Sequence, residues 1–229
     1  MRVQLAVEDI EPNHWIAWVL ALPACFSSAT TSADAVAYAP QKIAEYFSWL
    51  LAHNSLLPAV HEPIEVEVNE TFHSFASRED PTYIVNALFD DDRRPLGYWD
   101  VEIALQLLNW TRQDLLDVIQ STAQAQLTED NSGQVRASIP GILNHVAIAE
   151  NWYFNQFSFG LDQAQFPNNP LKRIEIVHAN TRARLVELIG DERIVRNCDE
   201  LWSARKIVRR TLWHIRDHTQ QIAQLLTRL

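Results

Sequence analysis

The C-terminal stretch, residues 203–229, contains neither proline nor glycine and has the apolar periodicity of one long helix. Apolar side chains, one threonine and two histidines recur there at steps of three and four residues, so they share one face of that helix. This stripe consists of Ile207, Thr211, His214, His218, Ile222, Leu225 and Leu229. Because such a stripe must be buried against other elements, the stretch predicts a helix packed within a helical domain.

Two of the stripe positions are histidines. His214 and His218 are separated by one helical turn, where Cβ atoms lie about 5–6 Å apart. Two imidazoles in a partly dry pocket cannot both be charged without a large cost, whereas a divalent metal uses both lone pairs. The alternative is that each is a hydrogen-bonded core histidine. The H-E-x-x-H pattern of zinc proteases is excluded, since position 215 is isoleucine.

The composition indicates a folded globular protein, because 47% of the 229 residues are hydrophobic and eight are tryptophan. The net charge of −10 argues against nucleic acid or an anionic membrane as the main partner. We expect no membrane span, because no uninterrupted apolar stretch of about 18 residues occurs. Cys25 and Cys198 form no disulfide or metal-binding motif, which is typical of a cytoplasmic protein.

The fold class predicted from the pattern is α+β. Residues 1–70 alternate like a small antiparallel sheet with one helix, followed by a connecting segment at 71–97. Strands are expected at 2–8, 14–20, 22–28 and 63–69. The helix is expected from Thr31 or Ser32 to about residue 53, with a kink or restart at Pro40.

From residue 98 onwards the periodicity is helical. Helices are expected at 98–123, 138–157, 171–189 and 203–229, with a polar loop at 124–134 and Gly190 ending the third helix. Each helix has one apolar stripe, which predicts a four-helix bundle over residues 98–229.

A third histidine lies on an inward stripe. His145 belongs to the helix at 138–157, and metal sites in bundles are built from inward residues of facing helices. His145, His214 and His218 are therefore the candidate metal ligands, and His178, at the edge of its own stripe, is the competing candidate. Three imidazoles leave one position of a zinc-type site open for chemistry. Tyr153 and Asp217 are candidate acid–base groups, with a packed ring and a solvated carboxylate as the alternatives.

Two segments carry a family resemblance. I-P-G-I-L-N-H-V-A-I-A-E-N-W-Y-F and W-S-A-R-K-I-V-R-R-T-L-W-H-I-R-D-H-T-Q-Q-I resemble the signature helices of DinB/YfiT-like proteins. The resemblance covers residues 98–229 and implies a four-helix bundle that holds a divalent metal ion, zinc or nickel, on His145, His214 and His218. It also implies the chemistry of S-transferases and isomerases of that family, in which the metal holds a low-molecular-weight thiol as thiolate.

The N-terminal region resembles a different family. The segment L-P-A-C-F-S-S-A-T-T and the order of expected elements are similar to the HicB-like antitoxin fold, with Ala24 and Ala29 where glycine is usual. This resemblance implies a protein partner for residues 1–70.

Two functions are therefore expected. The first is a metal-dependent thiol S-transferase or hydrolase acting on a small-molecule thiol or electrophile. The alternative is a non-catalytic, metal-stabilised protein whose HicB-like half contacts a protein partner. A third alternative is that both halves are structural and the three histidines are a relic without a function. A homo-oligomer is compatible with each of these alternatives.

Overall fold

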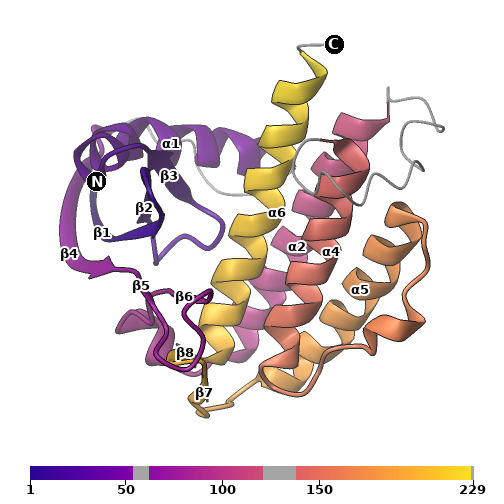
Figure 1. Ribbon diagram of the computed structural model, residues 1–229. Helices are drawn as coiled ribbons and strands as arrows, with labels where there is room; N and C mark the ends of the chain where they lie inside the picture. The colour runs from indigo at the N-terminus through magenta and orange to yellow at the C-terminus, as the bar shows by residue number, and fades with distance from the viewer. Residues whose placement is uncertain (54–61, 121–137, 228–229) are drawn as a thin grey trace. The chain divides into compact units, whose positions relative to one another are not determined.

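The computed structural model describes residues 1–53, 62–120 and 138–227, and the protein is α+β, as the sequence predicts (Figure 1). The chain forms two compact units. The first contains residues 1–94 and 196–203, and the second contains residues 95–195 and 204–229. The segment expected to connect the two halves, 71–97, thus belongs largely to the first unit, together with a short stretch from late in the chain.

The first unit is built on a four-stranded sheet with the order β3-β2-β1-β4. Its strands are β1 (Arg2–Glu11), β2 (His14–Trp18), β3 (Phe26–Ala29) and β4 (Glu65–His73). The β1–β2 and β2–β3 pairs are antiparallel, but β4 is parallel to β1. The expectation of a purely antiparallel sheet is therefore wrong. A crossover through a helix between β3 and β4 makes the parallel pair possible.

The third strand begins later than the predicted 22–28. The amide of Leu22 donates to the Val19 carbonyl and the amide of Cys25 donates to the Leu22 carbonyl, so these residues form turns. Ala24 has a positive φ of 70°, a conformation that normally favours glycine. The chain therefore becomes extended only at Phe26.

Helix α1 (Ser32–Ala52) covers the sheet through one small and apolar face. Thr31 caps it, since its hydroxyl accepts a hydrogen bond from the Asp34 amide at 3.1 Å. The helix runs through Pro40 without interruption, so the expected restart does not occur. The buried face consists of Ala35, Ala39, Ile43, Tyr46 and Leu50.

Small elements complete the first unit: β5 (Phe75–Ala76), β6 (Ile84–Val85), η1 (Asp91–Arg93), and the hairpin of β7 (Val195–Asn197) and β8 (Glu200–Trp202), whose first residue lies in the second unit. The sequence reading did not predict this hairpin. Its two-residue turn, Cys198-Asp199, has positive φ at both positions, where hairpins usually carry Asn-Gly.

The described part of the second unit contains four α-helices, which lie side by side in Figure 1: α2 (Tyr98–Ile119), α4 (Ile139–Asn155), α5 (Pro170–Leu185) and α6 (Ala204–Leu226). Helix α4 packs against α5 and α6, and α6 also packs against α2. The contact between α2 and α5 is much lighter. The buried side chains of the four helices include Leu107, Leu115, Ile142, Leu143, Val146, Ile174, Val177, Ile207 and Leu212.

The helix boundaries differ from expectation by a few residues. The third helix ends at Leu185, and a 3-10 turn, η3 (Val186–Leu188), replaces its last turn before Gly190, whose φ is 72°. A second 3-10 turn, η2 (Gln163–Gln165), lies between α4 and α5. The predicted loop at 124–134, the last predicted turn of the first helix at 121–123, and residues 228–229 lie outside the described residues.

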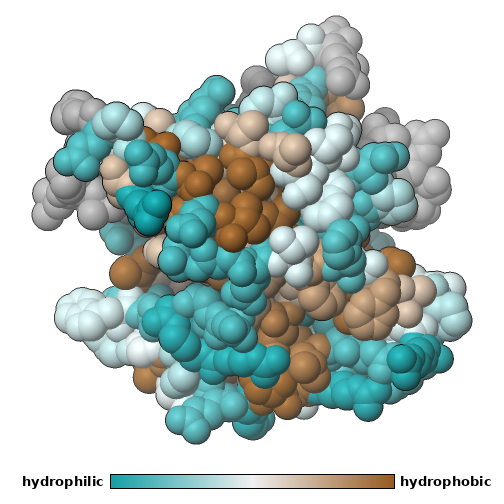
Figure 2. Space-filling view, turned by 90° about the vertical axis from the view of Figure 1, so that its left-hand side faces the viewer, coloured by the Kyte–Doolittle hydropathy of each residue, from teal (hydrophilic) through white to brown (hydrophobic). Residues whose placement is uncertain are grey.

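The face of the protein drawn in Figure 2 contains both polar and apolar side chains. On the face drawn in Figure 2, polar side chains predominate and apolar ones reach the surface in separate areas. Within the described parts of the chain, none of the helices has the length and apolar character needed to cross a bilayer.

Candidate metal centre

The two predicted ligands on α6 lie on its buried face. His214 is 5% exposed and His218 is 6% exposed, although imidazoles are polar. The N-terminal end of α6 is anchored within its unit, because the Arg205 guanidinium pairs with the Asp100 carboxylate at 2.8 Å and donates to the Pro95 carbonyl at 3.0 Å. These contacts fix the position of α6 along its axis, and its two histidines point into the interior of the unit.

The third histidine comes from α4. Ser138 caps this helix, accepting a hydrogen bond from the Gly141 amide at 3.2 Å, and Pro140 is tolerated in the first turn. His145 follows one turn later and is half-buried. Because α4 packs against α6, His145 faces the two histidines of α6.

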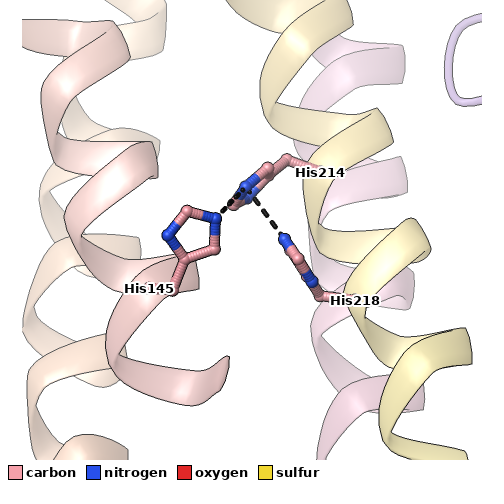
Figure 3. Close-up of side chains that lie close together, drawn as sticks. All are labelled: His145, His214 and His218. Atoms are coloured by element: carbon pink, nitrogen blue, oxygen red, sulfur yellow. Dashed lines mark hydrogen bonds between the residues drawn. The ribbon is translucent and has the colours of Figure 1, made fainter. Parts of the chain in front are cut away.

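The three imidazoles converge on one another (Figure 3). The Nε2 atoms of His145 and His214 are 3.1 Å apart, and the Nε2 atoms of His214 and His218 are also 3.1 Å apart. The potential ligand nitrogens of the three residues all lie within 4.8 Å of one another. The structure thus brings together the three residues that the sequence predicts as candidate metal ligands.

This contact pattern is difficult to satisfy with hydrogen atoms alone. Each Nε2 has either one hydrogen or one lone pair in the ring plane. The central Nε2 of His214 cannot direct a single hydrogen at both His145 and His218, and two facing lone pairs repel. A divalent cation accepts all three lone pairs, and a tetrahedral zinc ion with Zn–N bonds of about 2.0–2.1 Å separates its ligand nitrogens by roughly 3.3 Å. The two 3.1 Å separations are close to that value, and the third pair lies within 4.8 Å.

A glutamine orients one of the three histidines. The Nδ1 atom of His218 lies 2.7 Å from Oε1 of Gln221, one turn further along α6. An amide oxygen only accepts, so Nδ1 of neutral His218 has the hydrogen and Nε2 has the lone pair. This is the tautomer that binds a metal through Nε2. Gln221 was missed by the sequence reading.

Of the other predicted site residues, one lies beside the histidine cluster and two do not belong to it. Tyr153 is buried, and its ring lies edge-on to that of His214 with centroids 5.9 Å apart. Asp217 is half-buried and does not belong to the cluster of ligand atoms. His178 is not part of the cluster either, and its Nδ1 lies 3.8 Å from the Glu150 carboxylate.

The three histidines come from two helices that are distant in sequence and adjacent in space. Comparisons with protein-family models, curated proteins and solved structures find no match to this chain. The geometry of α4 and α6 is therefore the direct observation that bears on this site.

Proposed function

We propose that this protein binds one divalent metal ion, zinc or nickel, on His145, His214 and His218, and that its second unit is a DinB/YfiT-like four-helix bundle. The observation that carries the proposal is the pair of 3.1 Å contacts among three Nε2 atoms. The packing of α2, α4, α5 and α6 into one helical unit is compatible with that architecture.

We further propose that the site is catalytic and serves a thiol S-transferase or a hydrolase. Three protein ligands leave a coordination position open, as in catalytic and not structural zinc sites. When bound, such an ion lowers the pKa of a water or thiol, which supplies a nucleophile at neutral pH.

The protein's own residues prepare this site. Gln221 holds His218 in the ligating tautomer, and the edge of the Tyr153 ring limits rotation of His214. Burial of His214 and His218 keeps bulk water from one side of the cluster, whereas half-buried His145 borders the side from which a substrate approaches. Tyr153 is thus a positioning residue in this proposal, and Asp217 has no assigned role.

The alternative function is a non-catalytic, metal-stabilised binding protein. The order strand-strand-strand-helix-strand in the first unit supports a HicB-like fold for residues 1–70, and we propose that this half contacts a protein partner. In that case the metal stabilises the helical unit without performing a reaction.

The two functions are separated by an activity screen on the metal-loaded protein. Cysteine and glutathione are supplied as thiols with monochlorobimane as the electrophile, and a p-nitrophenyl ester tests hydrolysis. A catalytic site predicts turnover that is lost with a chelator and in the His145→Ala variant. Turnover that persists under both conditions contradicts the proposed site, and a metal-loaded protein with no turnover favours the alternative.

A further inference from the structure

A pocket opens between α2 and α5, which are in light contact with each other. Its charged wall contains Arg112 from α2, and Glu175, His178 and Arg182 from α5. None of the three clustered histidines lines it. The pocket is therefore a second candidate site, independent of the metal centre.

Arg112 is a basic group of this pocket that has an unsatisfied buried donor among the described residues. Its Nη1 atom is buried, and none of the described residues accepts a hydrogen bond from it. Burial lowers the pKa of its guanidinium, while the charges of Glu150 and Glu175 act in the opposite direction. A buried charged donor without an acceptor destabilises the folded protein. Arg112 also lines the pocket, so its guanidinium is a positive group that a ligand acceptor there can pair with.

Glu150, next to the pocket-lining His178, also has a side-chain atom without a hydrogen bond among the described residues. The side chain of Glu150 is only 3% exposed, and its Oε1 makes no hydrogen bond with any described residue. The closest basic group is Nδ1 of His178, 3.8 Å away, which is likewise buried and unbonded among the described residues. Buried polar groups in proteins are normally hydrogen-bonded, and His178, one of these two residues, also lines the pocket.

The charges select the class of ligand. Guanidinium groups bind carboxylates and phosphates through paired N–H donors. Glu150 and Glu175 lie close enough to influence Arg112, and their negative charge disfavours a doubly charged anion such as phosphate. A singly charged carboxylate therefore fits better.

The rest of the wall is apolar. Leu116, Leu171 and Ala179 complete the lining, and they favour a short hydrocarbon chain. At the rim, Arg182 donates to the Asn109 amide oxygen, which holds its guanidinium in place. We propose that this pocket binds a small aliphatic monocarboxylate, with the carboxylate on Arg112 and the hydrocarbon chain on Leu116, Leu171 and Ala179.

The binding test uses the full chain after treatment with a chelator, so that no carboxylate can bind to a metal. Isothermal titration with 3-methylbutanoate should give saturable binding at one site, with a dissociation constant of about 1 mM or lower, as expected for a ligand of this size. The neutral isostere 3-methylbutanamide and inorganic phosphate should each bind at least about tenfold more weakly. Absence of 3-methylbutanoate binding, or equal binding of phosphate, overturns the proposal.

Variants locate the ligand. Arg112→Gln should weaken 3-methylbutanoate binding at least about tenfold, since it removes a charged donor. Ala179→Phe places a large side chain in the pocket and should abolish binding. Because Ala179 is solvent-exposed, the circular dichroism spectrum should stay unchanged. The matched control is Arg184→Gln. Arg184 is an exposed arginine of the same helix and pairs with Glu187, so this variant should bind 3-methylbutanoate normally. Binding that survives both pocket variants, or that appears only in metal-loaded protein, contradicts the proposal.

Discussion

The Nδ1 atom of His218 and the Oε1 atom of Gln221 are 2.7 Å apart on consecutive turns of α6. The side chain that selects the tautomer of this histidine therefore comes from the same helix, so it stays in place when the helices move relative to one another. Partners of this kind commonly contribute 10–100-fold to metal affinity.

The first prediction concerns this partner. Gln221→Ala should weaken zinc binding about 10–100-fold, because Nδ1 of His218 loses its acceptor. Gln221→Glu should retain most of the affinity, since a carboxylate also accepts from Nδ1. Competition titration with a zinc chelator measures both. Gln220→Ala, at the exposed neighbouring position, is the control, and equal losses at positions 220 and 221 contradict the tautomer argument.

Removing a ligand should have a larger effect. His218→Ala leaves two imidazoles, and we expect zinc affinity to fall by at least about 10–100-fold, the range that even the partners of ligands reach. His73→Ala, an exposed histidine of the first unit, serves as the control. If His218→Ala binds zinc as tightly as the unaltered protein does, His218 is not a ligand.

Stability should depend jointly on metal and pH. Ligating imidazoles must be neutral, so protons compete with the metal at reference pKa values of about 6.5. Bound metal lowers the apparent pKa of its ligands, so its stabilisation is present above that pH and is lost as the pH falls. At a hundred times the dissociation constant, a ligand stabilises the folded state by about 2.7 kcal/mol.

Zinc should therefore raise the melting temperature by several degrees at pH 7.5 and by much less at pH 5. The apolar stripes still fold the helical unit without metal, so the effect is a shift and not a change from unfolded to folded. Differential scanning calorimetry at both pH values measures it. An equal shift in the double variant His214→Ala, His218→Ala means that the zinc binds elsewhere.

A fourth prediction concerns the hairpin of the first unit. Hydrogen bonds from the Arg78 amide, the Arg196 guanidinium and the Ser77 hydroxyl lower the pKa of the Asp199 carboxyl. A carboxyl with a lowered folded-state pKa stabilises the protein above its unfolded pKa of about 3.9, and this stabilisation disappears as the pH falls through the folded value. Asp199→Asn should therefore lower the urea midpoint at pH 6.

The same variant should also lose less stability between pH 5 and pH 2 than the unaltered protein. Glu102→Gln, an exposed carboxylate, is the control and should leave both quantities unchanged. An acid dependence in Asp199→Asn as steep as in the unaltered protein refutes this assignment.

The candidate site was predictable because it depends on helical periodicity. The i, i+4 spacing of His214 and His218 is set by local geometry, and His145 lies on the inward stripe of another helix of the same unit. Packing of α4 against α6 then brings the three together. Gln221 was not predictable, because an amide on a helix surface has no periodic signature and its contact depends on side-chain rotamers.

Other features depend on tertiary context. The sequence indicates that Glu150 points away from His145, but not that it meets His178 on α5. The β7–β8 hairpin and the late start of β3 both involve residues other than glycine with positive φ, at Cys198, Asp199 and Ala24. Sequence signals for turns rely on glycine and asparagine at such positions, so these turns leave no clear signal.

The central claim is that the three histidines bind one metal ion, and metal analysis of the protein purified without a histidine tag tests it most directly. Inductively coupled plasma mass spectrometry should find about one zinc or nickel ion per chain after dialysis against trace metal. The double variant His214→Ala, His218→Ala should contain almost none under the same conditions. Metal-free protein, or the same metal content in the double variant, would contradict the account.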